Sequence, residues 1–438
     1  MNHVFGSTAA PSPDLAAQMV EMQLPATILF AIAVAHTFFV KPLCSLSHRF
    51  REGSIGENLF HFLGEVEIVF GFWAFIMTIW WSFRFGTDSV AAYLDTVNFT
   101  EATFVFVIMC MAATRPIMQL ARTNVLRFAR ILPLSPGVAF FCTLLIVGPL
   151  LGSLITEPAA MTVTALLLRE AIGGASVSPR LKYATLGLLF VNISIGGTLT
   201  HFAAPPVVMV ARPWDWDAFF MLSHFGWRAS IAIFTGTVLT AALFRKELGS
   251  LTLTSESSTR PPSPTWVAIL HAGFIAMTVL YSHHVSFIVP LFLLFLGWAA
   301  ISEEYQDELR IRQSLLVSFF LGGLVTLGQL QAWWLKPLVE QLTNQTLFWG
   351  ATGLTAFTDN AALTYLGTLV PGLEESAKYA LVAGAVTGGG LTVIANAPNP
   401  AGYSILSPMF DEDGINPVYL ALAALPYTLL AAAAFLLL

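Results

Sequence analysis

Charged residues are scarce in this sequence. Asp, Glu, Lys and Arg together make up 11% of its 438 residues, whereas a soluble domain carries about 25%. Hydrophobic residues make up 56%, and long apolar runs recur along the whole length. The scarcity of charge excludes an ordinary soluble domain. The repeated apolar runs predict an all-α polytopic membrane protein.

Cysteine is also scarce. Cys44, Cys110 and Cys142 lie in or beside apolar runs and lack metal-ligand spacing. No HExxH pair occurs and no cysteine suggests a nucleophile, so we expect neither an enzyme nor a resident cofactor. The formal net charge of -6 argues against a nucleic-acid partner. The first twenty residues lack a basic segment followed by an apolar core, so we expect no cleaved signal peptide.

Ten apolar segments are long enough to cross a bilayer, which takes about 20 helical residues. They are 24–43, 59–82, 102–121, 182–199, 228–244, 266–283, 286–301, 313–334, 378–394 and 416–438. Two further stretches, 137–169 and 347–373, are apolar on both sides of a polar break. We predict that these two are re-entrant hairpins whose tips reach the middle of the membrane.

The distribution of Lys and Arg predicts the orientation. With ten crossings, fifteen of these residues fall on one side, including Arg310 and Arg312, and five on the other, including Arg212. The basic side of a membrane protein is usually cytoplasmic. We therefore expect a multi-pass protein of the inner (cytoplasmic) membrane with both termini outside the cytoplasm and residues 1–23 as an outward tail.

The two halves of the chain resemble each other. "ITEPAAMTVTALL" (155–167) parallels "FTDNAALTYLGTL" (357–369), and "GGTLTHFAAPPV" (196–207) parallels "GGLTVIANAPNP" (389–400). Each half has an odd number of crossings, so the second half is turned over relative to the first. We predict an inverted-topology repeat, with halves at 24–246 and 265–438 and a cytoplasmic linker at 247–264.

Each half carries a polar hairpin tip and a helix broken at glycines, the broken helices spanning 182–211 and 378–405. Glycine lets the backbone leave the helix, and the prolines that follow prevent its return. Coupling ions of inverted-repeat transporters bind at such breaks near the midplane. The predicted ion-binding and proton-exchange residues are Thr156, Glu157, Thr358, Asp359 and Asn360 at the tips, and Gly196, Gly197, Gly389, Gly390, Thr392, Asn396 and Asn399 at the breaks.

Sodium is expected at Asp359, Asn360 and Asn399, with Asp359 protonated whenever it does not hold the cation. A carboxylate inside a membrane is costly and usually functional, but Asp359 could instead cap the helix after the tip. Glu65 and Glu67 point to different faces of a helix. One of them is a candidate proton relay, and the alternative is a pairing with Arg115 or His61.

His201 is a further candidate relay, without a matching acid or histidine in the second half.

The tip "TDNAALTYL" and the break "GGGLTVIANAPNPAG" resemble the ion transporter superfamily, and within it sodium/proton antiporters including those of the NhaD type. The resemblance implies two scaffold and two transport subdomains, frequent dimers and elevator-like movement. The first half departs from the family pattern, because "HFAAPP" lacks both asparagines of "NAPNP".

We expect a sodium/proton antiporter that works by alternating access, with the lipid bilayer, sodium and protons as partners and a homodimer as assembly. The alternative is a carrier of anions or oxyanions, such as dicarboxylate or arsenite, from the same superfamily. Acidic residues at both tips favour the cation.

The predicted orientation can be tested by labelling. Cysteines introduced at 250–260 should react with a membrane-impermeant thiol reagent only from the cytoplasmic side, because the linker is expected there. Cysteines at Asp88 or near Asp14 should react only from outside. The opposite pattern would overturn the orientation derived from Lys and Arg.

Overall fold

The computed structural model describes residues 11–172, 177–251, 263–282, 284–410 and 414–438. The described part of the chain is helical, with turns between the helices and no strand, in agreement with the predicted class. Its α-helices are α1 (Pro13–Thr37), α2 (Val40–Ser47), α3 (Ile55–Leu63), α4 (Val69–Phe85), α5 (Thr87–Thr96), α6 (Thr100–Ala112), α7 (Arg115–Ile131), α8 (Pro136–Ile155), α9 (Glu157–Ile172), α10 (Pro179–Gly196), α11 (Pro205–Ala211), α12 (Ala218–Met221), α13 (Trp227–Leu243), α14 (Arg245–Gly249), α15 (Thr265–Leu280), α16 (Val285–Ile301), α17 (Ile311–Gly328), α18 (Ala332–Val339), α19 (Asn344–Thr355), α20 (Asn360–Thr368), α21 (Glu375–Gly388), α22 (Asn399–Leu406) and α23 (Pro417–Leu437).

Short helical turns of other types complete the described chain. They are η1 (Val66–Ile68), η2 (Gly197–Leu199), η3 (Leu222–Gly226), η4 (Glu303–Tyr305) and η5 (Ser407–Met409). The turn η3 is a π-helix that joins α12 to α13 without a break.

Six helices of the described chain are long and apolar enough to cross a membrane, or seven if the bent pair α5 and α6 forms one span. The six are Pro13–Thr37, Val66–Phe85, Pro136–Ile155, Ala218–Leu243, Ile311–Gly328 and Pro417–Leu437. Helices α15 and α16 are apolar but shorter. The helices are those of an integral membrane protein, with fewer of full crossing length than the ten predicted.

Several predicted boundaries differ from the structure. Residues 13–23 were predicted as tail but belong to α1, because the Ser12 hydroxyl accepts a hydrogen bond from the Leu15 N–H at 3.2 Å and caps the helix there. Three predicted crossings are each divided between two helices: 102–121 between α6 and α7 at Ala113 and Thr114, 59–82 between α3 and α4, and 313–334 between α17 and α18. Most of the predicted linker 247–264 lies outside the described residues.

The two predicted hairpins have first arms of different length. Helix α19 has 12 residues, which is the length of an arm that reaches half-way across a membrane. Helix α8 has 20 residues, continues through Pro149 and is long enough to cross by itself. The expectation of a half-membrane arm therefore fits α19 in length and does not fit α8.

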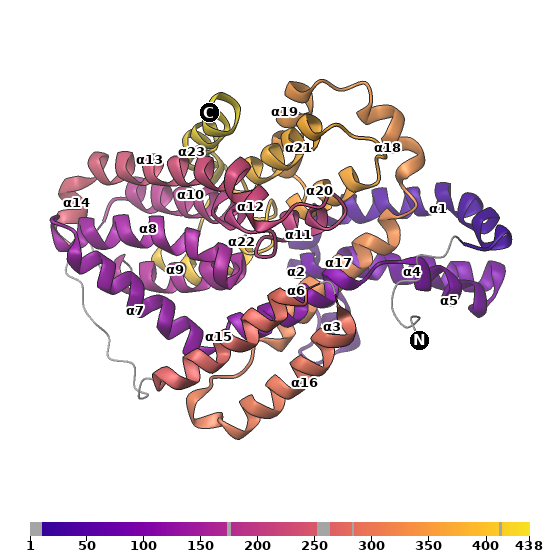
Figure 1. Cartoon of the computed structure of the whole chain (residues 1–438), viewed down its shortest axis with the longest axis horizontal. Coiled ribbons are helices and arrows are strands. Elements are labelled where there is room, and N and C mark those ends of the chain that lie inside the picture. Colours follow the sequence, from indigo (N-terminus) through magenta and orange to yellow (C-terminus); the bar gives the residue numbers. More distant parts are fainter. Residues whose placement is uncertain (1–10, 173–176, 252–262, 283, 411–413) are drawn as a thin grey trace.

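The helices form two packed groups with the tips and breaks between them (Figure 1). Helices α8, α10 and α13 lie side by side and pack with α23, while α1, α4, α6 and α17 pack around a second core. Between these groups α9 packs against α22, and α20 packs against α11. Helix α10 contacts α21 as well, so the two predicted halves meet along the broken helices.

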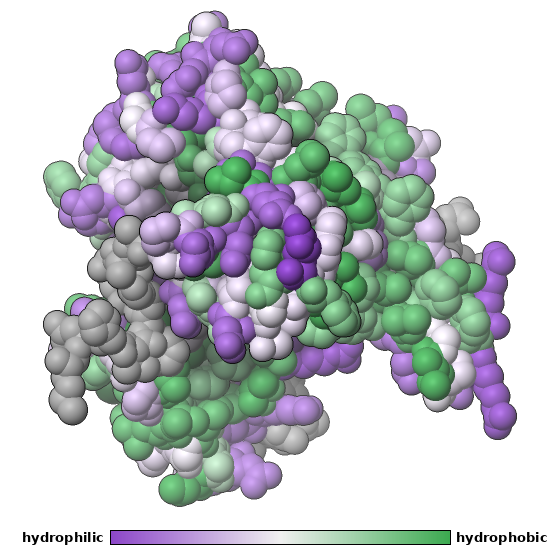
Figure 2. All heavy atoms as spheres, turned by 90° about the vertical axis from the view of Figure 1, so that its right-hand side faces the viewer, coloured by the Kyte–Doolittle hydropathy of each residue, from purple (hydrophilic) through white to green (hydrophobic). Residues whose placement is uncertain are grey.

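The surface is that of a protein surrounded by lipid. Figure 2 shows hydrophobic residues over much of the visible face, with the hydrophilic ones gathered in patches. Large exposed hydrophobic side chains lie on several of the long helices, among them Leu24, Phe83, Leu243, Leu293 and Leu422. Such a contiguous apolar exterior would aggregate in water and is stable in a bilayer.

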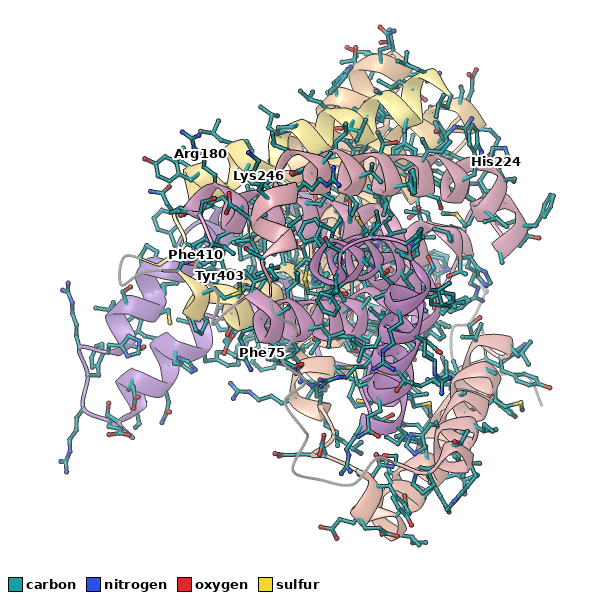
Figure 3. The ribbon with its side chains drawn as sticks, turned by 90° about the vertical axis from the view of Figure 1, so that its left-hand side faces the viewer. Phe75, Arg180, His224, Lys246, Tyr403 and Phe410 are labelled. Carbon is teal, nitrogen blue, oxygen red and sulfur yellow. The ribbon has the colours of Figure 1, made fainter. Side chains whose placement is uncertain are left out.

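Two basic residues lie at one end of the group of helices formed by α8, α10, α13 and α23. Figure 3 shows Lys246 and Arg180 near one end of α13 and His224 near the other end. Both basic residues belong to the side that the sequence predicts to be cytoplasmic.

Glycine allows α4 and α17 to approach closely. A methyl group at Gly323 of α17 would clash with the backbone of Phe70 and Gly71. Small residues at helix contacts in membranes allow such packing.

Gly323→Ala should therefore destabilise the fold, because overpacking costs about 1–3 kcal/mol and here the clash is with backbone that cannot rotate away. The measurement is the midpoint of thermal unfolding of the purified protein in detergent. Gly273→Ala in α15 is the control, since a methyl group there meets nothing within 4 Å. Equal midpoints for both variants would contradict the packing described.

Candidate functional site

The first tip is a single residue in an unusual backbone conformation. Helix α8 ends at Ile155, α9 begins at Glu157, and Thr156 between them has φ 73°. A positive φ is costly for a β-branched residue and is found where the surroundings impose it, often at functional sites. The Glu157 side chain is fully buried, and the Glu157 N–H donates to the Ala203 carbonyl at 3.3 Å.

The second tip is longer. Helix α19 ends at Thr355 and α20 begins at Asn360. The Asp359 carboxylate accepts a hydrogen bond from the Ala361 N–H at 2.8 Å, so Asp359 does cap α20. The Asn360 N–H donates to the Ala395 carbonyl at 3.1 Å, and the Asn360 side chain is buried.

The helices break where the glycines predict. Helix α10 ends at Gly196 and α11 begins at Pro205, while α21 ends at Gly388 and α22 begins at Asn399. Ala203 and Ala395, which accept the hydrogen bonds from the tips, lie in these two breaks. Each tip is therefore tied to the broken helix of its own half through the backbone.

The residues that occupy equivalent places in the two halves differ by one position from those that the sequence match aligned. Glu157 and Asn360 each begin a helix and each donate from the backbone to a break, so Glu157 occupies the place of Asn360 and not that of Asp359. The breaks are also shifted by one residue, but in the opposite direction, because Gly197 lies against Glu157 and Gly389 lies against Asn360. The expected pairing of Glu157 with Asp359 is therefore wrong in register.

Glycines at the breaks make room for the tip side chains. A methyl group at Gly197 would lie 2.5 Å from Glu157 Oε1, and one at Gly389 would lie 2.8 Å from Asn360 Nδ2. Gly196 packs against the Pro149 carbonyl, and Gly390 packs against the backbone of Val191. The first two glycines thus shape the site directly, while the other two allow helices to approach.

Glu157 connects the two halves. Its Oε2 accepts a hydrogen bond from Asn396 Nδ2 at 3.1 Å, and Asn396 lies in the break of the second half. Asn399 holds that break in place, since its Nδ2 donates to the carbonyls of Gly389 and Thr392 at 2.8 Å each. The Thr392 hydroxyl donates to the Ala356 carbonyl at 2.8 Å and ties the break to the second tip.

Several oxygen atoms around these contacts are buried and accept no hydrogen bond within the described chain. They are Thr156 Oγ1, Glu157 Oε1, Asn360 Oδ1, Asn396 Oδ1 and Asn399 Oδ1. A buried acceptor without a partner costs about 1–3 kcal/mol. Carboxylate, amide and hydroxyl oxygens are also the ligands that hard cations prefer. The arrangement suits a small hard cation.

Asp359 lies in a different environment from Glu157. It is half-buried and lines a cavity of about 100 Å³ that also contains Glu67 and the rings of Phe30, Phe70 and Phe320. Thr358 lines the same cavity, but its hydroxyl donates to the Leu354 carbonyl at 3.0 Å and so satisfies a carbonyl in the last turn of α19. The carboxylates of Glu157, Asp359 and Glu67 have no basic partner in the described structure.

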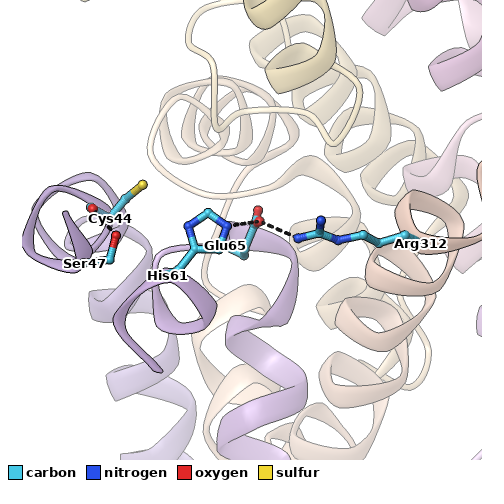
Figure 4. A network of polar contacts seen from close by, with 5 residues as sticks. All are labelled: Cys44, Ser47, His61, Glu65 and Arg312. Carbon is cyan, nitrogen blue, oxygen red and sulfur yellow. Dashed lines mark hydrogen bonds and ion pairs between the residues drawn. The ribbon is translucent and has the colours of Figure 1, made fainter. Parts of the chain in front are cut away.

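The side chains of Glu65 and Glu67 lie in different surroundings, as expected. Figure 4 shows that Glu65 lies between His61 and Arg312, at 3.7 Å and 3.4 Å. The pairing with His61 that was expected as an alternative is therefore present for Glu65, with Arg312 added. Glu67 lines both the Asp359 cavity and a neighbouring cavity of about 410 Å³, so it lies where the two cavities meet.

The larger cavity reaches the first tip. Thr156 and Pro158 line it together with Arg310, Arg312 and Ser404. Its lining mixes polar and apolar side chains, and both arginines belong to the side that the sequence predicts to be cytoplasmic. Thr156 therefore faces a cavity that Arg310 and Arg312 also line.

His201 lies in the first break but away from these cavities. It lines a third cavity with Glu101 and Arg212. The structure therefore does not bring His201 together with Asp359, Glu65 or Glu67.

Two residues of this region were missed by the sequence analysis. The Ser194 hydroxyl donates to the Val386 carbonyl at 2.7 Å and joins α10 to α21 beside Gly389. Glu101 is buried in the first turn of α6. Each is a polar residue inside an apolar run, "NISIGG" and "TEATF", and that signal could have found both.

One comparison with known proteins gives a match to a family. A family model described as "Putative Na+/H+ antiporter" matches residues 21–438, which is nearly the whole chain. No curated protein matches the sequence.

Asn399→Ala tests how the second break is held. The variant should lower the free energy of unfolding by about 1–3 kcal/mol, because the carbonyls of Gly389 and Thr392 lose their donor inside the protein. Thermal unfolding in detergent measures this. Asn344→Ala, at an exposed position at the start of α19, is the control. If the two variants unfold alike, Asn399 does not hold the break.

Proposed function

Because this chain belongs to the "Putative Na+/H+ antiporter" family, we propose that it exchanges sodium for protons at a site between its two tips. The family implies a transporter and not an enzyme. Glu157 and Asp359 are the two exchanging carboxylates of this proposal. Thr156, Asn360, Asn396 and Asn399 supply neutral oxygens to the cation.

The observation that carries the proposal is the burial of Glu157 without a positive charge beside it. Its Oε2 is held by Asn396 and its Oε1 has no partner in the described structure. An unpaired carboxylate inside a protein is expensive, by several kcal/mol even after relaxation. It is stabilised either by a proton or by a cation, and both cannot occupy the same oxygen. This competition is the basis of exchange.

Asp359 supplies a second charge near the first. It interacts electrostatically with Glu157 on one side and with Glu67 on the other. Like charges this close are not ionised together without a cation between them. We therefore propose that sodium binds when both tips are deprotonated, and that Glu67 passes protons between Asp359 and the larger cavity.

Repeated contacts support an inverted repeat. Helix α8 packs against α10 as α19 packs against α21, and α9 packs against α22 as α20 packs against α11. The hydrogen bonds from Glu157 to Ala203 and from Asn360 to Ala395 repeat in the same way. We propose that two inverted halves, with the second tip on a re-entrant segment and both termini outside the cytoplasm, expose the site alternately to the two sides.

A carrier of anions is a poorer fit. Arg312 lines the larger cavity, but Glu65 already pairs with it at 3.4 Å. The tips carry acids, and an anion placed between them would be repelled.

Exchange can be tested in everted membrane vesicles with an imposed pH gradient. Sodium or lithium added outside should collapse the gradient, because the outward-facing site takes up the cation and returns a proton. Choline chloride should have no effect. A response to the anion alone, with sodium replaceable by choline, would contradict the proposal and favour anion transport.

Substitutions at the tips test the roles of the two acids. Asp359→Asn and Glu157→Gln should each lower the exchange rate at least about 100-fold, a loss of roughly 2.7 kcal/mol in barrier height. Both keep the size of the side chain and remove its charge. Glu340→Gln, at an exposed position, is the control and should exchange normally. Exchange at the wild-type rate in Asp359→Asn would show that the site is elsewhere, and the same result in Glu157→Gln would leave a one-acid site at Asp359.

A further inference from the structure

The third cavity has an acid and an arginine in its lining, as the large one has, but it is much narrower. Its volume is about 20 Å³, whereas the large cavity has about 410 Å³. A space of 20 Å³ holds a single water, while the larger one holds many. Thr100, Glu101 and Phe104 of α6 line it on one side, and Val208, Ala211 and Arg212 of α11 and its end line it on the other.

The two cavities lie at corresponding places in the two halves. The large cavity is bordered by the start of α17 and by α22, and the small one by the start of α6 and by α11. Helices α11 and α22 each follow a glycine break, and α6 and α17 pack against each other. The arginines of the two cavities belong to opposite predicted sides of the membrane. Arg310 and Arg312 belong to the predicted cytoplasmic group, and Arg212 belongs to the group on the other side.

The small cavity borders the first break, which contacts Glu157. His201 and Phe202 of the first break line it, and the next residue, Ala203, accepts the hydrogen bond from the Glu157 N–H at 3.3 Å. A movement that widened this cavity would therefore reach the first tip from the side opposite to the large cavity.

Polar groups hold the small cavity together. Glu101 is only 8% exposed, accepts a hydrogen bond from Asn98 Nδ2 at 3.3 Å and interacts electrostatically with Arg212. Glu101 belongs to α6 and Arg212 follows α11, so their attraction joins the two walls. The wall on the α11 side is continuous with the break that carries His201.

We propose that the small cavity is the closed half of the ion path on the side opposite to the large cavity, and that the attraction between Glu101 and Arg212 holds it shut. This inference rests on the proposed exchange function and adds the second path to it. The structure is then open through the large cavity, and opening of the small one gives Glu157 access to the other side.

Thiol labelling of two matched positions tests this. Ser404 lines the large cavity and Ser282 the small one. Each is changed to cysteine in full-length protein whose Cys44, Cys110 and Cys142 have been replaced, and a membrane-impermeant reagent is applied to vesicles of either orientation. Ser404→Cys should react from the cytoplasmic side. Ser282→Cys should react slowly from both sides.

Adding Glu101→Gln should raise the reaction rate of Ser282→Cys several-fold from the outer side only, because one wall is released. Arg212→Gln removes the same attraction from the other wall and should have the same effect. Glu21→Gln, whose acid lies in an exposed pair with Arg84 at 3.0 Å, is the control and should leave the rate unchanged.

An unchanged rate in both Glu101→Gln and Arg212→Gln would overturn the inference, as would a rise from the cytoplasmic side. The result is separable from the exchange function. If the wild-type protein exchanged no sodium, the proposed function would fail, whereas the labelling would still report whether this contact closes the cavity.

Discussion

Most of the site depends on one constraint, which is that Glu157 is buried between helix ends with no positive charge beside it. The protein offers it one hydrogen bond, from Asn396, and leaves its other oxygen without a partner in the described structure. A fully paired carboxylate would be a stable structural element and a poor exchanger. An incompletely paired one is stabilised only by what it binds, and this is the physical requirement for a site that alternates between a proton and a cation.

The broken helices exist to make that burial achievable. A side chain at position 197 or 389 would overlap Glu157 or Asn360, and glycine at both positions leaves the space that these two residues occupy. The breaks also release backbone groups, and the protein re-satisfies them with Asn399, Thr392 and the N–H groups of the tips. Non-helical backbone at membrane depth is tolerated only when such partners are present. The polar residues of the site therefore stabilise the fold and, in the proposed mechanism, also bind the ion.

The sequence predicted which residues form the site better than it predicted which residue of one half corresponds to which residue of the other. Polar residues beside glycine and proline in an apolar run are visible without a structure, so the tips and breaks were found, and α10 and α21 end within two residues of the predicted glycines. Motif similarity alone paired Glu157 with Asp359, because two short similar segments can be aligned with a shift of one residue. Only the hydrogen bonds to Ala203 and Ala395 fix the correct correspondence. The pairing of Glu65 with Arg312 joins residues 247 positions apart, and no local sequence pattern predicts such a contact.

The central claim is that sodium and protons compete for the same carboxylates, and calorimetric titration of the purified protein with sodium tests it directly. Titrations in two buffers of different ionisation enthalpy give the number of protons released for each sodium bound. We predict proton release on binding and an apparent sodium affinity that weakens about tenfold for each unit by which the pH falls, when one proton competes. Sodium binding with unchanged affinity across this range and without proton release would contradict the account.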